Sequence, residues 1–203
     1  MTVATDYVLG SLGVVLGVRL GRGASRGSSR GLWAAALVAL AVAALAGGTA
    51  HGWADRLGSS GHWLVWRITF WSIGIGSLCL AAAAARFALP PRSARIAVAV
   101  FGLQFAVYAV WMLGHEDFDY VIMDYLPAMI FVLALAAWQW ARGWAGGPWV
   151  VGGIAVSFLA AAVQLSGFTL HSHFNHNDLY HVIQMLGVYM LYRGGALLAT
   201  APG

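Results

Sequence analysis

Long apolar segments, separated by short polar stretches, constrain this chain more than any other feature of its sequence. An α-helix needs about 17–25 mostly apolar residues to cross the hydrocarbon core of a bilayer. Seven segments meet that requirement, at residues 4–20, 32–53, 63–87, 93–113, 120–141, 148–168 and 177–198. Because an open sheet cannot satisfy its backbone in lipid, the sequence predicts an all-α bundle of seven transmembrane helices. The 203 residues are enough for one such domain.

The composition excludes several classes of protein. Apolar residues make up 61% of the chain and charged residues only 9%, whereas an average soluble domain is about 25% charged. A soluble globular protein is therefore not expected, and a disordered chain is excluded. The single cysteine, Cys79, excludes a disulfide scaffold. The chain contains eleven arginines and no lysine, which excludes a retinal-type Schiff base; this usage is typical of a GC-rich bacterial genome.

The arginines predict the orientation of the helices. Nine of them fall in the loops after the first, third and fifth segments or near the end of the last: Arg19, Arg22, Arg26, Arg30, Arg86, Arg92, Arg95, Arg142 and Arg193. Cytoplasmic loops are enriched in arginine, so we expect an external N-terminus and a cytoplasmic C-terminus in a bacterial inner membrane. The net charge of +4 is explained by these loops and does not indicate a nucleic-acid partner.

Every histidine and every acid falls on the opposite, extracytoplasmic side of this predicted bundle. The histidines are His51, His62, His115, His171, His173, His176 and His181. The acids are Asp6, Asp55, Glu116, Asp117, Asp119, Asp124 and Asp178. The positive-inside tendency does not account for the histidines. Their distribution therefore predicts a functional site at this end of the bundle.

The densest polar run, residues 171–181, leads into the last apolar segment. Its four histidines have the composition of a metal site, because neutral imidazole binds zinc, copper, nickel and iron. His181 lies at a depth where a polar group is costly and usually functional. Asn177 is four residues earlier and shares a helix face with it, whereas His176 is at the helix start. The alternative is that the asparagines and Asp178 cap the helix.

Two further charged residues lie within apolar segments. Asp124 needs a partner there, and the candidates are Arg67, a protonated histidine or a metal ion. Arg67 has three possible roles: it snorkels to the headgroups, it pairs with Asp124 or Asp119, or it holds the polar head of a substrate. Glu116 and Asp117 are expected to form a solvated loop.

A histidine that closes the second of seven helices and a histidine-rich entry to the seventh resemble the CREST superfamily of membrane hydrolases. That superfamily includes the alkaline ceramidases and the progestin and adipoQ receptors. His51 matches the histidine of its second helix, and the run Asp178-Leu-Tyr-His181 matches the end of its last-helix motif. The place of the first histidine in that motif holds Asn177, with His176 one residue earlier.

The resemblance implies one zinc ion and a membrane lipid as substrate. It implies His51, His176 and His181 as zinc ligands, with His115 in reserve. Three protein ligands leave a position for water, and zinc lowers the pKa of that water to about 7. The implied activity is hydrolysis of a lipid amide or ester at the extracytoplasmic end of the bundle.

The resemblance also assigns roles to the other charged residues. Asp178 or Asp124 would act as a general base or orient a ligand histidine, and Arg67 would stabilise an oxyanion or hold a headgroup. Two alternatives remain from the sequence. One is a metal-binding membrane sensor without turnover, and the other is a haem-binding electron carrier with His51 and His181 as its ligand pair.

Overall fold

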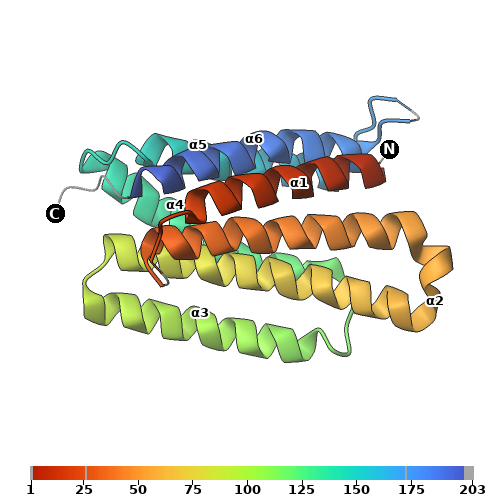
Figure 1. The fold of residues 1–203 in the computed structure, drawn as a ribbon, viewed down its shortest axis with the longest axis horizontal. Helices are drawn as coiled ribbons and strands as arrows, with labels where there is room; N and C mark the ends of the chain where they lie inside the picture. Colours follow the sequence, from red (N-terminus) through yellow and green to blue (C-terminus); the bar gives the residue numbers. More distant parts are fainter. Residues whose placement is uncertain (1, 26, 172, 199–203) are drawn as a thin grey trace.

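The computed structural model describes residues 2–25, 27–171 and 173–198, and in these ranges it consists of helices without strands. The elements are α1 Thr2–Gly21, α2 Ser29–Ala88, α3 Pro91–Trp111, α4 Phe118–Ala141, α5 Gly147–Ser166 and α6 His176–Ala196 (Figure 1). The predicted all-α class is confirmed. Five of the seven predicted segments each correspond to one helix, with ends within two residues, which is the usual uncertainty of helix boundaries.

The second and third predicted segments are joined in the 60-residue α2, which bends back on itself. The bend lies at Trp53, with φ −128° and ψ 20°, and at Gly58, with φ 63° and ψ 174°. Figure 1 shows the two limbs of α2, orange and yellow, running side by side in opposite directions. Glycine is required at position 58 because a Cβ atom disfavours that positive φ. The expected loop between these segments is therefore a mostly helical corner.

Several helices are long and apolar enough to cross a membrane. Among the described residues this holds for five helices, α1 to α5, with α2 counted once despite its two limbs. Helix α6 is not among them, because polar side chains occupy its first turns and Arg193 its last. Its polar residues are not simply exposed, however, since Asp178 and His181 are both buried against other helices.

Glycines let the helices approach closely. On α1, a Cβ atom added to Gly13 would lie 2.8 Å from the Ala41 Cβ of α2, and one added to Gly17 would lie 2.7 Å from Val38. Between α5 and α6, a Cβ at Gly153 would lie 3.1 Å from the carbonyl oxygen of Gly187. Small residues that allow such contacts are the usual means of packing helices in lipid, where no hydrophobic force holds them together.

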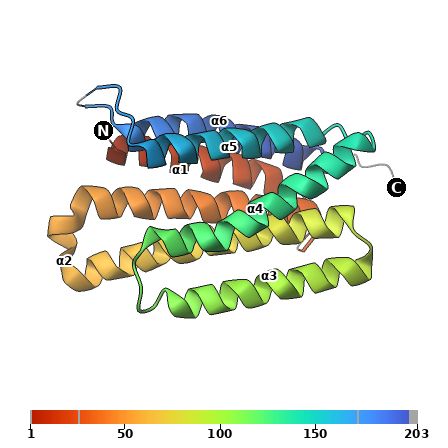
Figure 2. The same cartoon turned by 180° about the vertical axis from the view of Figure 1, so that it is seen from behind.

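The two ends of the bundle differ in chemistry, as the sequence predicts. The N-terminus, the bend of α2, the α3–α4 loop and the α5–α6 loop lie together at one end, which we call the histidine end (Figures 1 and 2). The α1–α2, α2–α3 and α4–α5 connections and the end of α6 lie at the other, the arginine end. Arg26, one of the predicted loop arginines, is outside the described residues.

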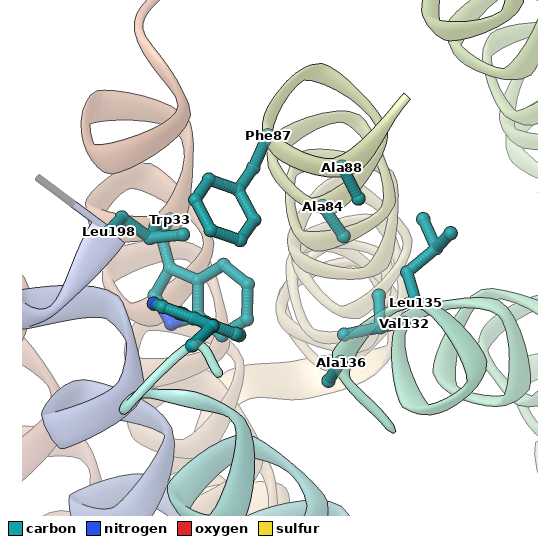
Figure 3. Close-up of a pocket in the computed structure, with 9 residues that line it drawn as sticks. Trp33, Ala84, Phe87, Ala88, Val132, Leu135, Ala136 and Leu198 are labelled. Atoms are coloured by element: carbon teal, nitrogen blue, oxygen red, sulfur yellow. The ribbon is translucent and has the colours of Figure 1, made fainter. Parts of the chain in front are cut away.

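Aromatic side chains fill the core at the arginine end. The Trp33 indole donates a hydrogen bond to the carbonyl of Leu191 at 3.0 Å, and the rings of Phe87 and Trp144 are 4.6 Å apart. Between them lies a cavity of about 10 Å³ with an almost wholly apolar lining (Figure 3). That volume is at the lower limit for one water molecule, so the cavity is a packing defect and does not hold a substrate.

Candidate functional site

A buried imidazole–carboxylate pair lies at the histidine end, between the first turns of α1 and α6. His181 Nε2 is 3.0 Å from Asp6 Oδ1. The two residues are only 7% and 4% exposed. Gly48 of α2 covers Asp6 so closely that a Cβ at position 48 would lie 2.7 Å from the Asp6 Cβ. Three helices therefore enclose a pair of ionisable groups, which is costly to bury unless the groups satisfy each other.

A threonine hydroxyl occupies the other side of the imidazole. Thr5 Oγ1 is 2.9 Å from His181 Nδ1, 3.2 Å from Asp178 Oδ1 and 2.9 Å from the carbonyl oxygen of Thr2. The helical spacing of α1 and α6 thus brings together four side chains, Thr5, Asp6, Asp178 and His181. We call these four side chains the His181 network.

Asp178 connects this network to the start of α6. The backbone N–H of Asn175 donates to Asp178 Oδ2 at 2.9 Å, while Asn175 Oδ1 accepts from the N–H groups of Asn177 and Asp178. This is a capping box, which satisfies helix donors that otherwise lack partners. The predicted capping role is confirmed for Asn175 and Asp178. Asp178 has a second contact as well, because its other carboxylate oxygen reaches His181 through Thr5.

The hydrogens available in the network allow more than one arrangement. If only His181 Nε2 is protonated, it donates to Asp6, and Nδ1 accepts the single hydroxyl proton of Thr5. If both ring nitrogens are protonated, Nδ1 donates to Thr5, whose hydroxyl is then free to donate to Asp178. Asp6 Oδ2 is buried and has no hydrogen-bond partner within the described ranges. The network can therefore take up one proton at His181 without any change in its heavy-atom contacts.

The four predicted zinc ligands are not brought together. His51 is exposed near the bend of α2, with its ring edge-on to Trp66 at 5.4 Å, although it is within electrostatic range of His181. His176 begins α6, and His115 stacks on Trp111 at 4.0 Å. In the part of the chain that the structure describes, no group of three or more His, Cys, Asp or Glu side chains is arranged to hold a metal ion.

Asp124 belongs to a separate polar cluster. It is 5% exposed and accepts hydrogen bonds from Ser77 Oγ at 3.3 Å and Gln104 Nε2 at 3.1 Å. The Gln104 amide also donates to the Asp124 carbonyl oxygen at 2.6 Å. The prediction that Asp124 has buried partners is confirmed, but these partners are neutral side chains of α2 and α3. The suggested pairing with Arg67 is wrong.

Arg67 is buried instead of snorkelling, with 1% of its side chain exposed. Its Nη2 donates to Glu116 Oε1 at 3.2 Å and is 3.4 Å from the Leu113 carbonyl oxygen. The pairing predicted with Asp124 or Asp119 is wrong. The partner is Glu116, which was expected to be only part of a solvated loop. No hydrogen bond or ion pair between described residues connects Arg67 to the His181 network.

The sequence interpretation missed Thr5 and Asp6. It emphasised the polar run before the last segment, whereas half of the network comes from the first segment. Asp6 carried a usable signal, since a carboxylate inside an apolar segment is costly and needs a partner. The same argument was applied to Asp124. Thr5 carried no signal, because a threonine beside a helix N-terminus is common.

One family model matches almost the whole chain, including the helices that carry the His181 network. Residues 1–200 match DUF6962, a family of unknown function. The chain belongs to this family. No curated protein and no solved structure matches it. Since the match extends over all the helices, it includes both the α1 and the α6 parts of the His181 network.

Proposed function

We propose that the protein is an integral membrane hydrolase that cleaves a lipid amide or ester at the His181 network. The observation that supports this proposal is an imidazole held between a carboxylate, Asp6, and a hydroxyl, Thr5. A base within hydrogen-bond reach of a hydroxyl and oriented by a third group is the signature of an activated nucleophile. The resemblance to lipid hydrolases, which rests on His51 and on the Asp178–His181 run, supports the same class of substrate.

In the first half-reaction, His181 Nδ1 removes the hydroxyl proton of Thr5 while Thr5 Oγ1 attacks the carbonyl carbon of the lipid. Asp6 accepts the Nε2 hydrogen and stabilises the imidazolium that forms. The proton then passes from Nδ1 to the leaving amine or alcohol as its bond to the carbonyl carbon breaks. The acyl group remains as an ester on Thr5.

In the second half-reaction, a water molecule attacks this ester. His181 Nδ1 accepts a proton from the water and returns it to Thr5 Oγ1 as the acyl–oxygen bond breaks, releasing a fatty acid. Asp178 accepts from the same hydroxyl and is held by the capping box. We assign it a positioning role, because it keeps Thr5 Oγ1 beside the imidazole.

Zinc, which the resemblance implies, does not fit the residues as they are arranged. A catalytic zinc site uses three protein ligands. Among the described candidate ligands, Asp6 and His181 are the pair in direct contact, and both ring nitrogens of His181 already have partners. Haem ligation by His51 and His181 conflicts with the same two contacts. The mechanism above therefore uses the side chains of the chain alone.

The test is fatty-acid release from defined lipids by the detergent-purified protein. Mass spectrometry would follow ceramide, N-acylethanolamine, monoacylglycerol and phosphatidylglycerol. We expect release from at least one lipid, and a decrease of about 10²- to 10⁴-fold in His181→Ala and Asp6→Asn, as for loss of general acid–base catalysis. Thr5→Ser should retain activity, and Thr5→Ala should lose it.

His173→Ala is the matched control, because His173 is exposed in the α5–α6 loop. It should leave the rate unchanged. Trapping of an acyl group on Thr5, located by peptide mass spectrometry, would identify the nucleophile. Folded protein that releases no fatty acid from any of these lipids would contradict the proposal and favour a sensor without turnover.

We also propose that the bundle crosses a bacterial inner membrane seven times. The two limbs of α2 would each form a span, and α6 would be the seventh, with its polar face against α1 and α5. The N-terminus would be external and the C-terminus cytoplasmic. The concentration of arginines at one end of the bundle supports this orientation. The His181 network would then face the extracytoplasmic side.

A further inference from the structure

Arg67 is a buried cation with too few hydrogen-bond partners. Two of its guanidinium nitrogens, Nε and Nη1, are buried without a hydrogen-bond acceptor among the residues that the structure describes. Its guanidinium carbon is 4.9 Å from the centre of the Trp63 ring and 5.9 Å from that of Phe70. Cation–π attraction replaces part of the lost hydration, but it does not supply the oxygen acceptors that a guanidinium fork can use.

The one anionic partner of Arg67 is weakly held. The Glu116 side chain is 57% exposed and lies in the short loop between α3 and α4. It contacts only Nη2, through a single oxygen at 3.2 Å. A bidentate oxyanion would form two parallel hydrogen bonds with the guanidinium and is geometrically preferred. Displacement of Glu116 by such an anion would expose little apolar surface, because this side chain is already mostly in solvent.

A shallow, open surface patch lies next to this loop, on the outer surface of α3. Its lining is mostly apolar and includes Val107, Val110 and Trp111. It also includes Gly114 and His115, which directly precede Glu116 in the chain. An exposed apolar helix face beside the loop that carries Glu116 matches the two parts of an anionic lipid, with the acyl chain along α3 and the headgroup at Arg67.

We propose that Arg67 binds the phosphate of an anionic membrane lipid and that Glu116 is an internal carboxylate which this lipid displaces. This site is separate from the His181 network, and its test measures lipid binding. The result of that test therefore does not depend on the proposed hydrolysis. A zwitterionic phospholipid is disfavoured, since its choline cation would be placed beside the same guanidinium.

The test is lipid binding by native mass spectrometry of the detergent-purified protein. The probes are dioleoyl phosphatidic acid, dioleoyl phosphatidylcholine and inorganic phosphate. We expect phosphatidic acid to bind best. Glu116→Gln, which weakens the internal competitor, should tighten that binding about 2- to 5-fold, the range of a partly exposed ion pair. Arg67→Gln should weaken it at least about 30-fold, as for loss of a buried charged contact.

Asp119→Asn is the matched control for Glu116→Gln. Asp119 is an exposed acid near the start of α4, so its removal changes the local charge equally without touching Arg67. Equal tightening in both variants would overturn the displacement mechanism. Equal binding of phosphatidylcholine would overturn the phosphate recognition, and equal occupancy by inorganic phosphate would overturn the lipid as its source. If Arg67→Gln does not fold, the Glu116→Gln and Asp119→Asn comparison still decides the question.

Discussion

At the scale of single residues, the buried ionisable groups differ in how many of their hydrogen bonds are made and in whether their partners are charged. Asp124 receives hydrogen bonds from neutral donors on two other helices. Arg67 has one exposed carboxylate and two unpaired nitrogens. His181 has a partner on each ring nitrogen, one of them charged. Buried polar groups whose hydrogen bonds are all made stabilise the fold. Chemistry and binding are expected at groups that lack hydrogen-bond partners or can exchange a proton.

Removing the hydroxyl of Thr5 should destabilise the protein by about 1–3 kcal/mol, because Thr5→Val leaves polar atoms of His181 and Asp178 without that partner. Thr69→Val is the control, since the Thr69 hydroxyl is also on a helix but donates only to the Val65 carbonyl of its own helix, at 3.0 Å. The free energy of unfolding in mixed micelles measures the difference. An equal decrease in the free energy of unfolding for the two variants would mean that the His181 network does not stabilise the fold.

At the scale of helices, close glycine contacts position the network. Gly10, Gly13 and Gly17 lie along one side of α1 and bring it against the first limb of α2. This contact places Asp6 against Gly48. On the other side, α6 packs between α1 and α5, and its Gly187 meets Gly153. The position of Asp6 relative to His181 therefore depends on backbone approach at glycines several turns away.

Enlarging one of these glycines should separate α1 from α2. A Cβ at Gly13 would be 2.8 Å from Ala41, so Gly13→Leu is expected to cost about 1–3 kcal/mol through overpacking. Gly102→Leu on α3 is the control, because a Cβ at position 102 meets nothing within 4 Å. Thermal unfolding in detergent compares the two. A lower melting temperature for Gly102→Leu than for Gly13→Leu would contradict the α1–α2 contact.

At the scale of the whole molecule, the two ends of the bundle carry different kinds of side chain. The first turns of α1 and α6, the α3–α4 loop and the α5–α6 loop lie at the histidine end, so the His181 network and Glu116, the partner of Arg67, lie there too (Figures 1 and 2). The connections that carry most of the arginines lie at the other end, although Arg56 is in the bend of α2. A membrane between these ends would keep the candidate sites on one side. Both proposed activities would then draw lipid from the same leaflet.

The proposed orientation is tested by labelling engineered cysteines with a membrane-impermeant maleimide in intact cells. In a Cys79→Ser background, Ser59→Cys at the bend of α2 should be labelled, because Ser59 is exposed at the histidine end. Ser25→Cys, exposed in the α1–α2 loop, should be labelled only after permeabilisation. The opposite pattern would invert the predicted topology and move the network to the cytoplasmic side.

The sequence by itself determined the helical class, most helix ends and the separation of the histidines from most of the arginines, because these follow from local hydropathy and charge. It also placed Asp178 and His181 near the start of the last helix. Only the tertiary structure decided their partners. Thr5 and Asp6 are more than 170 residues away from Asp178 and His181 in the sequence. Glu116 contacts Arg67 of α2 from the loop between α3 and α4. The periodicity of apolar residues does not specify such pairings. They depend on how closely the helices pack and on the rotation of each helix about its own axis.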